Sequence, residues 1–187
     1  MIQRLNTKDA AHAVRAGQVI AYPTEAVWGL GCDPFNQAAV AEILRLKQRS
    51  VQKGVILIAA SIAQVEPYLV GLTAEQYQRV VDSWSDDHGA NTWLVPLTTK
   101  IPAWISGVHD RVAIRVSRHP TVQALCLAYG GAIVSTSANP ATENAARTAA
   151  EVVAYFADQV PCVVGEVGQL ARPSVIRDVI TGQVVRA

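Results

Sequence analysis

Short apolar runs alternate with amphipathic stretches along almost the whole chain. Apolar runs bounded by turn-forming residues predict buried strands. These runs lie at Val19–Tyr22, Val55–Ala59, Trp93–Leu97, Val112–Val116, Ala132–Ser135 and Val175–Val179, with shorter ones near Val163 and Val184. Between them, apolar residues recur at helical spacing. The alternation predicts one α/β domain over residues 1–187, built on a twisted sheet of mixed parallel and antiparallel strands with flanking helices.

Capping residues place the helices. Asn6, Asn36, Thr73, Pro120 and Thr148 each stand where an amphipathic stretch begins. Asn and Thr side chains accept hydrogen bonds from the free N–H groups of a first helical turn, and proline is favoured at its first position. Glycines after two of the stretches, at residues 17 and 130, mark helix ends.

Composition narrows the class of protein. Half of the 187 residues are hydrophobic and 17% are charged, which excludes an intrinsically disordered chain. The formal charge is +1, whereas proteins that coat nucleic acid are usually much more basic. Cys32, Cys126 and Cys162 form no CxxC pair, which is typical of reduced thiols in the cytosol. With no signal-peptide pattern or apolar run of membrane-spanning length, a soluble cytoplasmic protein is expected.

The first segment that can carry chemistry is YPTEAVWGLGCDP, residues 22–34. It leaves a buried strand and is expected to form a loop that carries two glycines. Because ligands of α/β sheets gather where strands end, Thr24 is a candidate contact for a small polar substrate. A tight turn with a solvated Glu25 explains the segment equally well. The glycines do not form a GxGxxG dinucleotide fingerprint.

The second segment places three cations, Lys47, Arg49 and Lys53, where a helix ends and before a strand begins. Lys47 and Arg49 converge only if the chain unwinds between them, because alternate residues of a helix point apart. Such a loop can surround a triphosphate. The chain has no GxxxxGK[ST] phosphate loop, so these side chains would have to replace its backbone cradle. Taken alone, cations at a helix end are explained as readily by the helix dipole.

In the third segment, an apolar strand turns into hydroxyls and an amide at Ser135-Thr136-Ser137-Ala138-Asn139. Such groups bind phosphate or carboxylate oxygens, although they also satisfy their own backbone in turns. Arg115 lies inside the apolar strand at Val112–Val116, so it needs either a buried carboxylate partner or an anionic ligand. Ser174 and Arg186 near the C-terminus are weaker candidates, and Arg177 is equally ambiguous. The four histidines show no metal-ligand spacing.

Taken in order, these segments resemble the YrdC/TsaC family, the threonylcarbamoyl-AMP synthases. The resemblance is strongest over residues 17–186. It rests on YPTEAVWGLGCDP, on Lys47-x-Arg49 followed by Lys53-Gly54, on AIRVSRHP, on Ser137-x-Asn139 and on PSVIRD. The chain is similar to the short, single-domain form of the family. It departs from the family's Trp-Pro-Gly-Pro-x-Thr pattern in the longer, acidic stretch between Trp84 and Thr92.

The resemblance implies a YrdC-like sheet around a positively lined cavity, and the conversion of L-threonine, bicarbonate and ATP into threonylcarbamoyl-AMP and pyrophosphate. It implies two groups of site residues. ATP would be held by Lys47, Arg49, Lys53, Ser137, Asn139 and Arg186, of which Lys47 and Arg49 would be catalytic. Threonine would be held by Thr24, Arg115, Ser135 and Ser174.

The product would feed the threonylcarbamoyl modification of the adenosine beside the tRNA anticodon, so downstream tRNA-modifying proteins are expected partners. Mg²⁺ is expected to accompany ATP, with no metal site formed by the protein's own residues. Two alternatives stay open. One is an RNA-binding module that uses the same basic groove, and the other is a carbamoyltransferase like the hydrogenase-maturation relatives.

Overall fold

A computed structural model describes residues 3–85 and 90–186 of the chain. Over these residues it is one α/β domain with a ten-stranded sheet and seven α-helices. The strands are β1 (Arg4–Leu5), β2 (Ile20–Pro23), β3 (Trp28–Gly31), β4 (Ile56–Ala59), β5 (Asn91–Pro96), β6 (Arg111–Val116), β7 (Ile133–Ser137), β8 (Cys162–Val163), β9 (Val175–Asp178) and β10 (Val184–Arg186). The helices are α1 (Thr7–Arg15), α2 (Gln37–Lys47), α3 (Ile62–Val65), α4 (Ala74–Ser85), α5 (Ala103–Ser106), α6 (Pro120–Tyr129) and α7 (Ala149–Phe156), with 3₁₀ turns η1 (Val51–Lys53) and η2 (Glu66–Tyr68).

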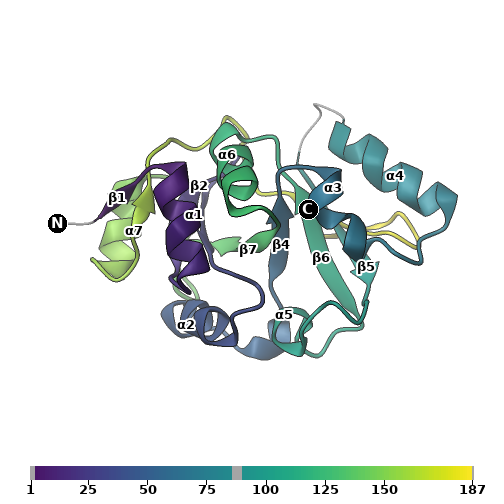
Figure 1. Cartoon of the computed structure of the whole chain (residues 1–187), viewed down its shortest axis with the longest axis horizontal. Coiled ribbons are helices and arrows are strands. Elements are labelled where there is room, and N and C mark those ends of the chain that lie inside the picture. Colours follow the sequence, from purple (N-terminus) through teal and green to yellow (C-terminus); the bar gives the residue numbers. More distant parts are fainter. Residues whose placement is uncertain (1–2, 86–89, 187) are drawn as a thin grey trace.

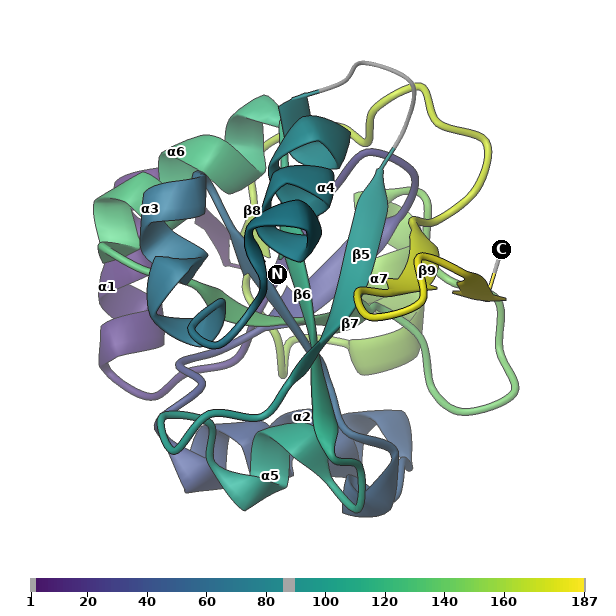
Figure 2. The same cartoon turned by 90° about the vertical axis from the view of Figure 1, so that its right-hand side faces the viewer.

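The sheet is mixed, as the alternation of strands and helices predicts. Its order is β1-β8-β2-β3-β7-β4-β6-β5-β9-β10. The central strands β4 and β6 are parallel, whereas β7 runs antiparallel to both of its neighbours, β3 and β4. Near one edge, β5 pairs parallel with β9, so the C-terminal strands β9 and β10 form that edge of the sheet. Figures 1 and 2 show the sheet passing through the middle of the molecule with helices around it.

Strand alternation divides the buried side chains between two cores, because successive residues of a strand point to opposite faces. Leu57 of β4 and Ile114 of β6 belong to the larger core, which α2, α4 and α7 cover. Ile58 of β4 and Ile133 of β7 belong to the smaller core. Helices α1 and α6 pack side by side over the smaller core (Figure 1).

The face under α1 and α6 is only partly covered by helices. Further along the same face, Ile56 of β4 pairs with Ser135 of β7, and both residues line a cavity. Helices α2 and α5 lie next to each other at the end of the sheet that borders this cavity (Figure 2). The fold therefore leaves a hollow on the sheet face that polar residues of β6 and β7 line.

The helix-start signals are confirmed. Asn6 and Asn36 accept hydrogen bonds from N–H groups in the first turns of α1 and α2, and Thr148 with Glu151 forms a capping box on α7. One expectation was wrong: the glycines at 29 and 31 lie in strand β3, paired with β2 and β7, and not in a loop. At Gly31 a Cβ atom would lie 2.7 Å from the carbonyl oxygen of Val134, so neighbouring strands require a residue without a side chain.

Part of the acidic stretch between Trp84 and Thr92, residues 86–89, lies outside the described residues. In the described part of the chain, no helix has the length and apolar character needed to cross a membrane.

Candidate active site

A cavity of about 580 Å³ opens on the sheet face beside α5. Its walls come from segments that are far apart in the sequence: the β2–β3 turn, the η1 turn, strands β6 and β7, and the C-terminal strands β9 and β10. Cationic side chains on these walls are Arg49, Lys53, Arg111, Arg115 and Arg186. Asp110 is the carboxylate among the described residues that line it.

The cation segment unwinds as the sequence argument required. Helix α2 ends at Lys47, and Gln48 takes a left-handed conformation with φ of 50°, so the chain turns sharply before Arg49. The Arg49 guanidinium donates to the carbonyl oxygen of Gly54 at 3.1 Å, which holds it across the η1 turn. Burial and the nearby charge of Arg186 both lower the pKa of Arg49. Arg49 and Arg186, which are far apart in the sequence, therefore share this part of the cavity.

Lys47 lies behind the cavity wall and does not line it. Its side chain is 4% exposed. The Nζ group donates to the carbonyl oxygens of Ser137 and Asn139, the latter at 2.9 Å, and to Asn139 Oδ1 at 3.2 Å. Burial, followed by the charge of Arg49, lowers the pKa of Lys47 to about 8. These hydrogen bonds connect the end of α2 to the polar segment at the end of β7.

That polar segment contributes its hydroxyls and its amide differently. Ser135 and Ser137 point from β7 into the cavity, on the same face as Ile133. Asn139 turns inward, where its amide donates to the carbonyl oxygens of Pro140 and of Glu143, at 3.0 and 2.7 Å. The serines are therefore available to a ligand, whereas Asn139 stabilises the turn behind them.

Arg115 is buried and paired with a carboxylate. Its guanidinium forms an ion pair with Glu25, whose other carboxylate oxygen accepts a hydrogen bond from the Ser117 hydroxyl at 2.7 Å. Desolvation lowers the pKa of Arg115 to about 10, which leaves it protonated at neutral pH. Of the two alternatives open for this arginine from sequence, the carboxylate partner is confirmed. Arg115 also lines the cavity, so an anionic ligand for it stays a prediction. The reading of Glu25 as a solvated turn residue was wrong, because its side chain is 16% exposed and tied to Arg115.

Two hydroxyls complete this side of the cavity. Thr24 is 5% exposed, and its hydroxyl donates to the carbonyl oxygen of Val27 at 2.8 Å within the β2–β3 turn. Ser174 is 4% exposed and lies 2.7 Å, oxygen to oxygen, from the buried hydroxyl of Thr92. Thr92 lies on β5, which pairs with β9. Its contact with Ser174 therefore helps to hold the start of β9 in place.

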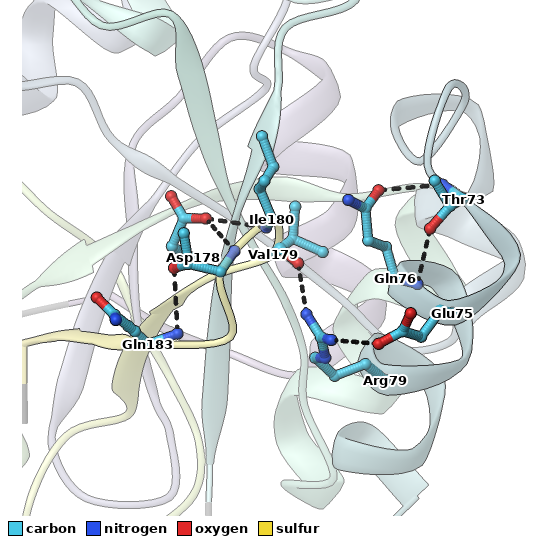
Figure 3. Close-up of polar contacts among 9 residues, drawn as sticks. Thr73, Glu75, Gln76, Arg79, Asp178, Val179, Ile180 and Gln183 are labelled. Atoms are coloured by element: carbon cyan, nitrogen blue, oxygen red, sulfur yellow. Dashed lines mark hydrogen bonds and ion pairs between the residues drawn. The ribbon is translucent and has the colours of Figure 1, made fainter.

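Arg111 was not among the residues singled out in the sequence, yet it lines the cavity. It forms an ion pair with Asp178 at the end of β9. The other Asp178 oxygen accepts from the backbone N–H groups of Ile180 and Thr181, at 2.9 and 3.0 Å, and so shapes the β9–β10 turn (Figure 3). Arg111 thereby links β6 to the hairpin that presents Arg186. Its position on the cavity wall could not be predicted from an arginine at the start of a strand.

The cavity brings together all but two of the ten residues that the family resemblance assigns to ATP or threonine. Those that line it are Thr24, Arg49, Lys53, Arg115, Ser135, Ser137, Ser174 and Arg186. Lys47 and Asn139 stand directly behind its wall. Among the described residues there is no group of three or more His, Cys, Asp or Glu side chains that could hold a metal ion.

Comparison with known proteins places this geometry in a family. The family model Sua5_yciO_yrdC, described as "Telomere recombination", matches residues 12–187. The chain belongs to this family. As a Sua5/YciO/YrdC protein, it is 50% identical to a threonylcarbamoyl-AMP synthase of Pseudomonas paraeruginosa strain PA7, over 100% of this chain and 99% of the relative. It is 53% identical to the threonylcarbamoyl-AMP synthase of Cellvibrio japonicus, over 95% and 93% of the two chains.

Solved structures agree on the fold of this Sua5/YciO/YrdC protein. The crystal structure of P. abyssi Sua5 complexed with L-threonine superposes with a TM-score of 0.85 at 25% identity. The match covers 95% of this chain and 54% of that chain, so the chain spans about half the length of that relative.

Proposed function

We propose that this protein is a threonylcarbamoyl-AMP synthase, which condenses L-threonine, bicarbonate and ATP into threonylcarbamoyl-AMP and pyrophosphate. The observation that carries the proposal is that one cavity combines a cationic side with a side of nearly buried hydroxyls around Arg115, which is buried and paired with Glu25. Such a cavity suits the joining of a polyphosphate to a small amino acid. Full-length relatives with half of their residues identical support the same reaction.

Threonine is proposed to lie against Arg115, with its carboxylate on the guanidinium. Arg115 stays charged, and Glu25 fixes its orientation from the side away from the cavity. The hydroxyls of Ser135 and Ser174 are proposed to bind the ligand's polar groups, and Thr24 closes the same side. Since these hydroxyls are nearly buried, a hydrogen bond to substrate replaces few bonds to water.

ATP is proposed to lie along the opposite side of the cavity, with its phosphates near Arg49, Lys53, Ser137 and Arg186. The arginines offer planar forks that match phosphate oxygens, and the lysine offers a compact charge. Lys47 and Asn139 are proposed to act on ATP from behind, by holding the Ser137 segment and adding positive charge to the wall. This positively lined cavity takes the place of a phosphate-binding glycine loop.

The proposed chemistry needs no nucleophile from the protein. The threonine amine attacks the carbon of CO₂ and loses a proton, or attacks bicarbonate with loss of water, and in both cases forms a carbamate. A carbamate oxygen then attacks the α-phosphorus of ATP. The bond from that phosphorus to the bridging oxygen breaks, and pyrophosphate leaves with its electron pair. The cysteines offer no competing nucleophile, because burial raises the pKa of Cys126 to about 12 and of Cys162 to about 11. The protein's part is to position the reactants and neutralise phosphate charge.

Mg²⁺ is proposed to enter with ATP and to neutralise charge on its phosphates. Mg²⁺ is often bound through substrate phosphates, waters and one or two carboxylates rather than by a cage of protein ligands. The donor set fits that mode, since Asp110 is the single carboxylate among the described lining residues. The product is proposed to pass to the proteins that modify the adenosine beside the tRNA anticodon.

Pyrophosphate release by the purified protein tests the proposal. We expect release to require ATP, threonine and bicarbonate together, and to stop when any one of them is omitted. Arg49→Ala should lower turnover strongly while leaving the melting temperature within a few degrees of wild type. As a matched control, Arg45→Ala removes an exposed cation of α2 that points away from the cavity. Pyrophosphate release without threonine, or normal release by Arg49→Ala, would overturn the assignment.

A further inference from the structure

A second, wider cavity of about 870 Å³ lies on the opposite face of the C-terminal part of the sheet. Its walls come from α4, β5, β9, the β9–β10 turn and the segment before Pro173. Its volume falls within the range of small-molecule sites, roughly 300–1,000 Å³. Apart from Pro173, it shares no lining residue with the proposed active-site cavity.

Strand alternation separates the two cavities. Ile176 of β9 lines the active-site cavity, as does Ser174 directly before the strand, whereas Val175 and Arg177 of β9 line the second one. On β5, Asn91 and Trp93 line the second cavity and pair in register with Val175 and Arg177. A ligand in the second cavity would therefore rest against the same two strands that hold Ser174, but on their other face.

Three arginines line this second cavity, and no carboxylate does among the described lining residues. Arg172 is exposed, and no contact with another described residue occupies its guanidinium. Arg177 is half-buried, and its Nε donates to the amide oxygen of Asn91 at 3.3 Å; no acid in the described part of the chain pairs with it. Arg177 thus has guanidinium N–H groups to spare beside the cavity.

Arg79 is the best anchored of the three. From α4 it donates to the carbonyl oxygen of Val179 and to Glu75, both at 2.9 Å (Figure 3). At Gly182 a Cβ atom would lie 3.5 Å from Arg79 Nη1, so the turn passes close to the guanidinium. Figure 3 shows Arg79 reaching from its helix toward the β9–β10 turn, where Gln183 lies. The arginine therefore has a fixed place on the wall, and its positive charge is partly balanced by an exposed glutamate.

Like charges that gather on a concave surface repel one another and attract anions. Arginine forks bind phosphate oxygens in pairs, and the side-chain amides of Asn91 and Gln183 add neutral donors on the same wall. From this arrangement we propose that the second cavity is a binding site for a small oligophosphate anion, of the class of pyrophosphate or the phosphates of a nucleotide. The proposal stands on this cavity and is independent of the reaction assigned to the first.

Calorimetric titration of the purified protein with inorganic pyrophosphate tests the site. Because the active-site cavity is also cationic, the titration is done on Arg49→Ala, in which that competing site is weakened. We then expect a remaining binding event whose Kd rises at least about tenfold when Arg172→Gln and Arg177→Gln are added. The matched control is Arg45→Gln, which removes one exposed cation away from both cavities and should leave the Kd unchanged. Arg172→Gln alone changes an exposed side chain, so it keeps the test valid if Arg177→Gln impairs folding.

Unchanged pyrophosphate binding in Arg172→Gln and in the double substitution would overturn the proposal. A parallel titration with a short single-stranded RNA separates a small-anion site from a nucleic-acid surface, since both present phosphate. If RNA binding depends on these arginines and pyrophosphate binding does not, the proposal is likewise overturned. Pyrophosphate binding that depends on the arginines and persists in the presence of RNA supports it.

Discussion

At the scale of single residues, two buried cations determine how the site is built. Arg115 stands out in the sequence because a charge inside an apolar strand requires a partner, and that requirement was met. The identity of the partner could not be predicted, because Glu25 and Arg115 are far apart in the sequence and are brought together only by the folding of the sheet. Lys47 gave no such signal, since a lysine at a helix end is normally solvated, yet here it is buried behind the Ser137 segment.

Glu25→Gln tests the positioning of Arg115. Removal of the carboxylate leaves a buried guanidinium with a neutral partner, so its orientation toward the threonine carboxylate weakens. We expect the KM for threonine to rise about tenfold, equivalent to about 1.4 kcal/mol, with a much smaller change in the KM for ATP. Steady-state kinetics with each substrate varied in turn measure the two values. Glu42→Gln, which breaks an exposed ion pair with Arg45, is the control; an equal rise in both KM values would contradict the positioning role.

The pH dependence of stability and of activity tests the role proposed for Lys47. Its pKa in the folded protein is about 8, below the 10.5 of the unfolded chain. Between these values the unfolded state binds more protons, so the free energy of unfolding should rise with pH from about 8 to 10.5. Activity, in contrast, should fall as the pH rises through this range. If a charged Lys47 is needed to hold the ATP wall, kcat/KM for ATP falls above an apparent pKa of about 8.

Lys47→Arg provides the comparison, because arginine stays protonated throughout this range. The alkaline fall in kcat/KM should then disappear or move upward, whatever the variant's absolute rate. The same alkaline limb in Lys47→Arg would show that another group titrates.

At the scale of elements, the strands and helices with strong periodicity or caps were predicted correctly, including α1, α2, α6 and α7. Strand β3 was missed because glycines usually mark loops, and one of its glycines, Gly31, is required by a neighbouring strand that no local signal reveals. Helices α3 and α5 are single turns, too short for a period to be read. The bend at Gln48 was anticipated as a condition for Lys47 and Arg49 to meet, and the left-handed cap provides it.

Gly54→Ala tests the turn that carries the cations. Gly54 has φ of 60°, and a Cβ there would lie 2.9 Å from the carbonyl oxygen of Ser106 on α5. We expect a loss of about 1–3 kcal/mol from the backbone conformation, and a further loss from displacement of α5. Since Arg49 binds the Gly54 carbonyl, the KM for ATP should also rise.

Gly71→Ala is the matched control, because Gly71 also has a positive φ, of 92°, but no atom within 4 Å of its Cβ position. Chemical denaturation of both variants measures the difference in unfolding free energy. If Gly71→Ala is as destabilising as Gly54→Ala, contact between the η1 turn and α5 does not constrain the site.

At the scale of the whole molecule, the sequence predicts the fold class and most of the residues that line the cavity, but not how they meet. The strand order brings the β2–β3 turn, the η1 turn and the C-terminal hairpin to one hollow, and that order depends on long-range pairing. Arg111 and the opposite-face cavity were missed for this reason, and Arg177, an ambiguous candidate in the sequence, could not be assigned to that cavity. Their roles follow from which face of β6 and β9 they occupy, and a one-residue shift in register would exchange the two faces.

The central claim is that this one cavity joins threonine, bicarbonate and ATP. Mass spectrometry of a reaction run with ¹³C-labelled bicarbonate tests it most directly. We expect an adenylate that contains threonine and carries the ¹³C label, formed by the wild-type protein and strongly reduced in both Arg49→Ala and Arg115→Ala. An unlabelled adenylate, or a labelled one formed equally by both variants, would contradict it.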